Sequence, residues 1–369
     1  MNGPAFSADL VSNASEPVGN RIDCDVHVVL PDINLLLPYL EPYWRDYVVV
    51  RGVRNLDLTA YPDTTPLAAR DDWRNISGRG GANLELTRKH VFEDLGGGTA
   101  ILNCVWGAQA LHHPHLAAAL CGAVNDWLAE EWLDKDTRLK ASIVVPWQHA
   151  AHSVAEIEKR SADKRFVQVL LPGLLEQPLG FEHYWPIYEA AQRHGLPIGV
   201  HAGTAYRHAP TSLGYPSHYL EDYIAMAWGM QNQLMSLVCD GIFAKFPDLK
   251  VVMIESGWTW LPSFLWRANK IWRAMRMEVP WVNRAPAEIV RENVRFTLQP
   301  IDAPPSQQQL DRTIEQIGSD RVLLYSSDYP HHHFDANDVL PGGLSPKFLQ
   351  RLLSENALET YPRLQGGRA

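Results

Sequence analysis

Four polar side chains, Asp25, His27, His201 and Asp328, each stand at the end of a short apolar run of the chain. Asp25 and His27 form a D-x-H pair, and because side chains alternate along a strand, a period of two places both on one face together with Asp23. A D-x-H pair can bind one metal ion through both side chains. The alternative to metal binding is that each residue has only a local role. A strand-end Asp or His can hydrogen-bond nearby backbone, and an acid after a strand can cap the next helix.

Taken together, these residue types favour the chemistry of a catalytic metal ion. Two imidazoles and a carboxylate match the three protein ligands of a catalytic Zn²⁺, which keeps a water whose pKa falls to about 7. We therefore predict one divalent ion, with Zn²⁺ the first choice, bound by Asp25, His27, His201 and Asp328. Asp328 is also predicted to act in catalysis by accepting the proton of that water.

A fifth candidate, Glu255, follows another apolar run and is predicted to be catalytic. It can orient a metal ligand, bind substrate or shuttle protons; alternatively it is a buried scaffold residue paired with Arg267 or another arginine, because buried carboxylates need partners. The fourth apolar run ends in Leu170, Leu171 and Pro172, which offer no lysine or acid to bridge a second ion. This favours a single metal ion.

Further candidates lie in segments that follow the predicted strands. Guanidinium and aromatic groups there can hold a small acid with a flat ring. The predicted substrate-binding residues are Trp147, Tyr206, Arg207, His208, Trp258 and His331. The histidine clusters at 112–115 and 331–333 are expected to face solvent or to bond backbone, with His331 the best ligand candidate among them because it follows Asp328 by three residues.

The elements that must position these residues alternate between strand-like and helix-like segments. Near-continuous apolar runs are typical of parallel strands buried on both faces, and helical periodicity marks 116–132, 185–193 and 220–246, the last long enough for two helices. We predict a single-domain (β/α)₈ barrel over 1–369, with the candidate residues at the carboxyl ends of its strands, where barrel active sites lie. The predicted strands are 22–29, 99–105, 140–145, 166–171, 197–200, 250–254, 293–298 and 321–326.

Residues 30–98 do not fit this alternation. The segment separates the first two predicted strands, and its Trp44, Tyr47, Tyr61 and Trp73 can be buried. A connection of this length is more often functional than a plain loop. We predict an insertion that acts as a lid over the pocket.

Composition excludes several other classes of protein. The 369 residues are 46% hydrophobic, which supplies a large core, and 33 Lys and Arg against 42 Asp and Glu give a net charge of −9. Without clustered basic residues, nucleic-acid binding is disfavoured. No segment resembles a membrane span or a signal peptide, so we expect a cytoplasmic protein. The four scattered cysteines suggest neither disulfides nor a thiolate site.

Several motifs together resemble the amidohydrolase-2 branch of the amidohydrolase superfamily. They are IDCDVHV, VLLPG, YWPIYEAAQRHGLPI, PIGVHAGT, VVMIESGWTWLP and LLYSSDYPHHH, in this order between residue 22 and about residue 335. The branch includes aminocarboxymuconate semialdehyde decarboxylase, resorcylate-type decarboxylases, and hydrolases and hydratases of ring-cleavage products. The resemblance implies a metal-binding barrel, often dimeric, that acts on small carboxylated or cyclic compounds.

The resemblance also assigns positions. It implies that the first-strand metal pair falls on Asp25 and His27, the fifth-strand ligand on His201 and the eighth-strand acid on Asp328. The chain departs from the family twice: D-x-H stands where H-x-H or E-x-H is more familiar, which makes the site more oxygen-rich and opens it to Mn²⁺. Glu255 stands where the characterised decarboxylases carry a histidine.

These observations leave three functions open. The first choice is a hydrolase that cleaves an amide, lactam or C–C bond of a ring-derived acid, with the metal-bound water as nucleophile. The alternative is non-oxidative decarboxylation of an aromatic or muconate-type acid, in which the metal holds the substrate carboxylate. Neither needs a redox cofactor. A barrel that binds a small ligand without catalysis is the third.

Overall fold

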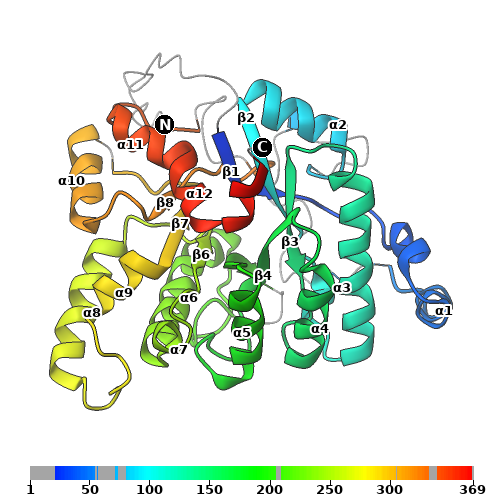
Figure 1. The fold of residues 1–369 in the computed structure, drawn as a ribbon, viewed down its shortest axis with the longest axis horizontal. Helices are drawn as coiled ribbons and strands as arrows, with labels where there is room; N and C mark the ends of the chain where they lie inside the picture. Colours follow the sequence, from blue (N-terminus) through cyan, green and yellow to red (C-terminus); the bar gives the residue numbers. More distant parts are fainter. Residues whose placement is uncertain are drawn as a thin grey trace.

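The computed structural model describes residues 21–54, 56, 71–73, 80–204, 209–304, 306–331 and 339–367. Within them, eight strands form one sheet whose order follows the chain, and every neighbouring pair is parallel. Figure 1 shows these strands at the centre with helices around them. The strands are β1 (Arg21–His27), β2 (Gly97–Asn103), β3 (Leu139–Val144), β4 (Phe166–Leu174), β5 (Ile198–Thr204), β6 (Val251–Ile254), β7 (Val294–Thr297) and β8 (Leu323–Leu324).

Hydrogen bonds between the first strand and the segment after β8 close the sheet. The His27 N–H donates to the Tyr329 carbonyl at 2.7 Å, and the Asp328 N–H donates to the Asp25 carbonyl at 3.1 Å. Val26 and Tyr329 form a parallel bridge. The predicted (β/α)₈ barrel is thereby confirmed.

Each predicted apolar run overlaps a strand because its side chains are buried on both faces of the sheet. One cluster joins non-neighbouring strands and therefore fills the barrel lumen; it includes Ile22, Cys24, Ile101, Leu170, Ile254 and Leu324. The larger cluster packs between the sheet and the helices. The strands differ from the predicted ranges mainly in length, since β8 has only two residues and β4 continues to Leu174.

The helices cover the outside of the barrel. The predicted 185–193 helix is found with the same bounds, and 220–246 divides into two helices at Gly241, whose φ of 74° is left-handed. The helices are α1 (Pro42–Arg51), α2 (Leu84–Thr87), α3 (Pro114–Leu128), α4 (Ala150–Arg160), α5 (Trp185–Arg193), α6 (Tyr219–Cys239), α7 (Ile242–Lys245), α8 (Leu261–Met275), α9 (Pro286–Asn293), α10 (Gln307–Ile317), α11 (Pro346–Gln350) and α12 (Asn356–Thr360).

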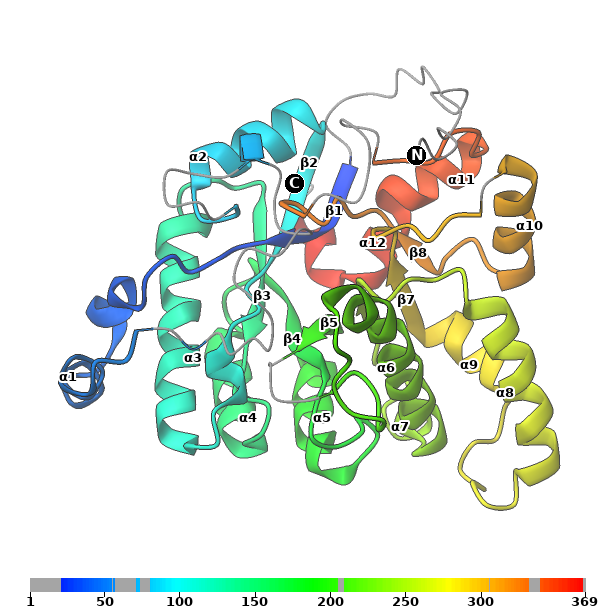
Figure 2. The same cartoon turned by 180° about the vertical axis from the view of Figure 1, so that it is seen from behind.

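The structure describes the 30–98 insertion in part. In both Figure 1 and Figure 2, α1 lies at the side of the barrel, away from the strands. Trp73 is buried, and its ring lies 5.6 Å from the ring of His90 and 5.1 Å from that of Tyr329. Trp44 and Tyr47 are half-buried, while Tyr61 is outside the described residues. The lid function remains a prediction.

The C-terminal segment closes the amino-terminal end of the barrel. Arg363 donates hydrogen bonds to the carbonyls of Ser161, Asp163, Phe166 and His194, all at or before the starts of β4 and β5. Its guanidinium therefore ties the end of the chain to two strands. Tyr361, two residues earlier, is fully buried and belongs to the lumen cluster.

Replacement of Arg363 by alanine is expected to lower the free energy of unfolding by about 2–4 kcal/mol, because it leaves several partly buried carbonyls without a charged donor. Urea denaturation of the two proteins measures this change. Arg273→Ala is the matched control, since Arg273 is exposed on α8. Equal stability of the Arg363 and Arg273 variants would show that the clamp is dispensable.

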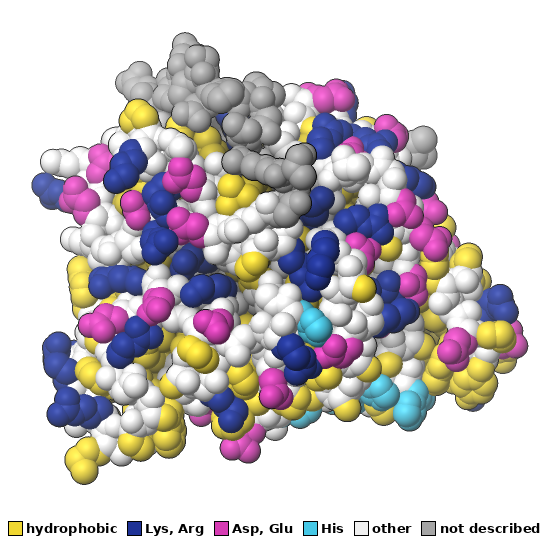
Figure 3. Space-filling view, viewed as in Figure 1, with side chains coloured by type: hydrophobic (Ala, Val, Ile, Leu, Met, Phe, Trp, Pro, Cys, Tyr) yellow, Lys and Arg dark blue, Asp and Glu magenta, His cyan; other side chains and the backbone are white. Residues whose placement is uncertain are grey.

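The surface matches the composition. In the space-filling view, basic and acidic side chains are interspersed over the visible face (Figure 3). Within the part of the chain that the structure describes, no helix is long and apolar enough to cross a membrane.

Candidate metal centre

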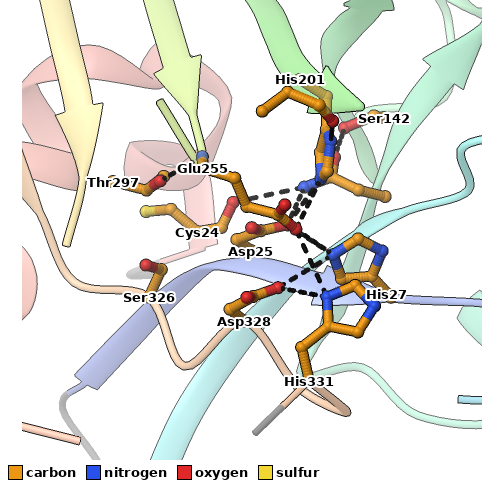
Figure 4. A network of polar contacts seen from close by, with 12 residues as sticks. Cys24, Asp25, His27, Ser142, His201, Glu255, Thr297, Ser326, Asp328 and His331 are labelled. Atoms are coloured by element: carbon orange, nitrogen blue, oxygen red, sulfur yellow. Dashed lines mark hydrogen bonds and ion pairs between the residues drawn. The ribbon is translucent and has the colours of Figure 1, made fainter. Parts of the chain in front are cut away.

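Side chains from four strands and the segments after them meet at the carboxyl end of the barrel (Figure 4). Two overlapping groups place one ligand-type atom of each residue within 4.8 Å of the others: Asp25, His27, His201 and Glu255, and then His27, Glu255, Asp328 and His331. The two groups share His27 and Glu255. His27 Nε2 has one lone pair and can bind one ion. The two groups therefore cannot each hold an ion through this nitrogen.

Glu255 and the first-strand histidine form the centre of this cluster. His27 Nε2 lies 2.7 Å from Glu255 Oε1 and 3.0 Å from Asp328 Oδ1. His201 Nε2 lies 3.3 Å from the same Glu255 oxygen and 3.6 Å from Asp25 Oδ1. The tertiary structure therefore brings together all five residues that the sequence analysis proposed as ligands or catalysts.

The backbone at Glu255 and Asp328 is strained in the same way. Among the described residues, these two are the non-glycine residues with positive φ, 53° and 57°. Such a conformation costs about 1–3 kcal/mol and is typical of functional sites. Each follows a short strand, and the Glu255 N–H donates to Thr297 Oγ1 at 3.0 Å. The left-handed turn directs each side chain into the mouth of the barrel (Figure 4).

The buried carboxylates create a negative field that changes the ionisation of the imidazoles. Burial alone would lower the pKa of His27, but the nearby Asp25, Asp328 and Glu255 carboxylates raise that pKa to about 10. Burial likewise opposes protonation of His201, yet Glu255 and Asp25 raise its pKa. In return, the surrounding histidines hold the pKa of Glu255 below its ordinary value despite burial and the Asp328 charge. The site therefore favours positive charge at its centre.

The residues present fit a divalent metal ion. Within the described part of the chain, neither Asp25 Oδ2 nor His201 Nε2 has a hydrogen-bond partner, although both atoms are buried. His201 Nδ1 bonds the Ala202 carbonyl, which fixes the ring with Nε2 directed into the cluster. A buried set of imidazole nitrogens and carboxylate oxygens suits Zn²⁺ or Mn²⁺.

His331 stands at the rim of the cluster. Its Nδ1 lies 3.0 Å from Asp328 Oδ1 and 3.5 Å from Glu255 Oε1. Although burial works against it, Asp328 and Glu255 raise the pKa of His331 well above its ordinary value. The side chain is 31% exposed, unlike the fully buried Asp328 carboxylate. The structure thus places this predicted substrate-binding residue beside the candidate ligands.

Asp23 lies apart from the cluster, contrary to the simple alternation predicted for the first strand. The pairing of β1 with β2 is irregular between Asp23 and Val26. The Asp23 carboxylate accepts the N–H groups of Asp25 at 3.2 Å and Ser327 at 3.0 Å. Burial raises the pKa of Asp23 to about 7. This residue therefore supports the backbone on both sides of the site.

The remaining predicted substrate contacts divide into two groups. Trp147 and Trp258 are buried in the core between sheet and helices, and Trp258 Nε1 donates to the Leu298 carbonyl. Their contact with substrate stays a prediction. Tyr206, Arg207 and His208 lie outside the described residues.

The structure bears on two alternatives from the sequence analysis, the partner of Glu255 and the role of the histidine clusters. Among the described residues, the ionic partners of Glu255 are His27, His201 and His331. Arg267 is exposed on α8, so the scaffold pairing with Arg267 is wrong. The expectation for the histidine cluster at 112–115, that its members face solvent or bond backbone, is confirmed because all three histidines are exposed. His112 is exposed and pairs with Glu176, and His113 caps α3. His332 and His333 lie outside the described residues.

Sequence reasoning missed two further residues. Asn103, the last residue of β2, donates through Nδ2 to Asp25 Oδ1 at 2.8 Å. Its position at the carboxyl end of a strand, where the other candidate residues also lie, could have identified it as a site residue. Tyr223 of α6 is near enough for the Glu255, Asp328 and Asp25 charges to add to burial in raising its pKa. Helical periodicity gave no signal for this residue.

Comparison with known proteins identifies the family. The sequence profile described as Amidohydrolase matches residues 22–363, nearly the whole chain. The chain belongs to the amidohydrolase family. The resemblance seen in the sequence motifs is confirmed, and this amidohydrolase is a member of a family of enzymes.

One curated relative is the gamma-resorcylate decarboxylase of Polaromonas sp. (strain JS666), 26% identical over an alignment of 286 residues that covers 74% of this chain and 85% of that protein. Solved structures confirm the fold. A dihydroxybenzoic acid decarboxylase from Polaromonas sp. JS666, with bound manganese and 2-nitroresorcinol, has a TM-score of 0.66 at 18% identity and covers 95% of this chain and 98% of its own. The 5-carboxyvanillate decarboxylase of Sphingomonas paucimobilis has a TM-score of 0.69 at 19% identity, with 94% and 99% covered.

Proposed function

We propose that this protein is a metal-dependent, non-oxidative decarboxylase of a hydroxylated aromatic acid. The observation that carries the proposal is the cluster of three carboxylates and three imidazoles at the barrel mouth, in a chain whose relatives are named as decarboxylases of such acids. Hydrolysis was the first choice from the sequence. The relatives favour its alternative instead.

Asp25, His27, His201 and Asp328 would hold one divalent ion. Bound there, the ion would supply positive charge to fix the substrate carboxylate and a neighbouring ring hydroxyl. We propose Mn²⁺ ahead of Zn²⁺, because Asp25 and Asp328 make half of the proposed donor set oxygen and a related decarboxylase contains manganese.

Decarboxylation replaces a C–CO₂⁻ bond by a C–H bond, so each turnover releases CO₂ and consumes one proton. Asp328 and His331 are the pair that supplies it in this proposal. Their side chains are 3.0 Å apart, Asp328 is buried at the centre of the site, and His331 is partly exposed. His331 can therefore take a proton from solvent and pass it to Asp328, which delivers it to the ring carbon.

Glu255 has a different role in this scheme. Its Oε1 lies 2.7 Å from His27 Nε2 and 3.3 Å from His201 Nε2, the nitrogens that would bind the ion, so it places negative charge beside the ion's position. It also adds negative charge beside the position of the substrate carboxylate. We propose that this charge lets the product CO₂, which is neutral, leave readily, and that it disfavours a second carboxylate near the metal.

The test is a product assay with the full-length protein loaded with Mn²⁺. The panel contains 2,6-dihydroxybenzoate, 5-carboxyvanillate and other hydroxybenzoates, with lactams and amides of ring-derived acids as the hydrolysis arm. We expect CO₂ release with loss of the substrate absorbance, and no release after the metal is removed with a chelator. Hydrolysis of an amide or lactam without CO₂ would favour the first choice from the sequence, and no turnover in either arm would favour the binding barrel.

A further inference from the structure

A chain of polar side chains runs through the otherwise apolar lumen, from the closed end of the barrel to the candidate metal centre. Tyr361 Oη donates to Gln168 Oε1 at 3.1 Å, and Gln168 Nε2 donates to Asn103 Oδ1 at 3.1 Å. Asn103 Nδ2 then donates to Asp25 Oδ1 at 2.8 Å. All four side chains are fully buried.

The direction of these hydrogen bonds follows from chemistry. An ionised Asp25 carboxylate can only accept, so the Asn103 amide must present Nδ2 to it and Oδ1 to the other side. That oxygen accepts from Gln168 and also from Ser142 Oγ at 2.6 Å, while Ser142 accepts from Gln168 at 2.7 Å. Every bond in the chain therefore donates towards Asp25. Aligned donors of this kind polarise one another and strengthen the last bond.

The neighbouring strand leaves room for this arrangement. A Cβ at Gly199 of β5 would lie 2.5 Å from the Gln168 amide carbon and 2.7 Å from its nitrogen. Gly199 is not one of the glycines with a positive φ, so its backbone conformation does not require glycine. Glycine at this position is explained by the space that the Gln168 side chain occupies.

We propose that Asn103 is a positioning residue that fixes the carboxylate plane of Asp25 for the metal ion, and that Gln168 and Tyr361 hold Asn103 in turn. The C-terminal segment, anchored by Arg363 two residues after Tyr361, thereby supports the metal centre from the opposite end of the barrel. The inference rests on the proposed metal site but not on decarboxylation. Loss of a residue that orients a metal ligand typically weakens metal affinity by about 10–100-fold.

The experiment measures Mn²⁺ affinity of the chelator-stripped, full-length protein by the electron paramagnetic resonance signal of free Mn²⁺. Asn103→Leu is expected to raise the Kd by about 10–100-fold, and Tyr361→Phe by a smaller factor because it acts through two further side chains. Substitution of Co²⁺ provides a second readout. Its visible absorption spectrum should change in both variants if the ligand geometry changes.

Tyr188→Phe is the matched control. Tyr188 is equally buried, and its hydroxyl donates to the Leu179 carbonyl at 2.6 Å, in the layer between sheet and helices. Its loss should lower thermal stability about as much as Tyr361→Phe does, without a change in Kd or in the Co²⁺ spectrum. Equal Kd values in Tyr361→Phe and Tyr188→Phe would contradict the role of the far end of the chain.

The outcomes separate this inference from the proposed function. A folded Asn103→Leu variant with the wild-type Kd and Co²⁺ spectrum would overturn it, and absence of Mn²⁺ and Co²⁺ binding by the wild type would overturn both proposals. Metal binding that Asn103→Leu weakens, in a protein that decarboxylates none of the panel, would support the positioning role while the proposed function fails. If Asn103→Leu does not fold, the comparison of Tyr361→Phe with Tyr188→Phe decides.

Discussion

Replacement of His201 by alanine is expected to reduce the bound divalent metal from about one ion per chain to a small fraction of that value. The reason is geometric: His201 Nδ1 is bound to the Ala202 carbonyl, so Nε2 faces Asp25 and Glu255 and is the one imidazole nitrogen that β5 contributes. Elemental analysis by mass spectrometry of both proteins gives the number and identity of the ions.

The control for this measurement is His183→Ala, because His183 is an exposed histidine in the segment before α5. Metal content should be unchanged in that variant. Stability offers a second readout, since an ion at 100 times its Kd stabilises the folded state by about 2.7 kcal/mol. A chelator should therefore lower the Tm of the wild type and leave that of His201→Ala unchanged. A His201→Ala protein that keeps its full metal content would rule out the proposed ligand set.

Replacement of Asp328 by asparagine is expected to reduce kcat for CO₂ release by about 10²–10⁴-fold, the usual contribution of a positioned proton donor. Asparagine preserves the size of the side chain but cannot carry the proton that the ring carbon requires. Single-turnover assays at saturating Mn²⁺ check this, because saturation offsets the weaker binding expected from the loss of a ligand.

His331→Gln is the companion variant. His331 contacts Asp328 at the rim of the site, so its loss should slow turnover less than Asp328→Asn does, and external imidazole should restore part of the rate. Metal content should remain near that of the wild type. An Asp328→Asn enzyme with the wild-type rate at saturating metal would remove Asp328 from the proton-transfer step and leave Tyr223, whose pKa is raised by burial and by the Glu255 and Asp328 charges, as the candidate donor.

The residue after β6 is a departure that the sequence motifs imply: the resemblance places a histidine in the characterised decarboxylases where this chain has Glu255. The structure places the Glu255 carboxylate 2.7 Å from His27 and 3.3 Å from His201, and the two rings lie 4.9 Å apart at nearly a right angle. A carboxylate there adds negative charge beside both rings, whereas a neutral imidazole would add none. The reaction proposed for this chain therefore relies on Asp328 and His331 for proton transfer.

The sequence alone determined the barrel and the convergence of five candidate site residues. Continuous apolar runs separated by helical periodicity specify parallel strands because both faces of such strands are buried, and the carboxyl ends of parallel strands meet at one end of the barrel. Asp25, His27, His201, Glu255 and Asp328 could therefore be predicted to converge before any coordinates were known. This prediction needs only the order of elements and the position of each residue within its strand.

Only the tertiary structure decided how these side chains are oriented and what supports them. The irregular pairing of β1 turns Asp23 away from the mouth, and the left-handed backbone at Asp328 brings His331 back to the cluster. Local periodicity cannot show either effect, because both depend on hydrogen bonds between the first and last strands. The path from Tyr361 to Asn103 depends on contacts across the lumen between segments far apart in the chain. Such contacts exist only when the barrel is closed, and for that reason the sequence contained no pattern that revealed them.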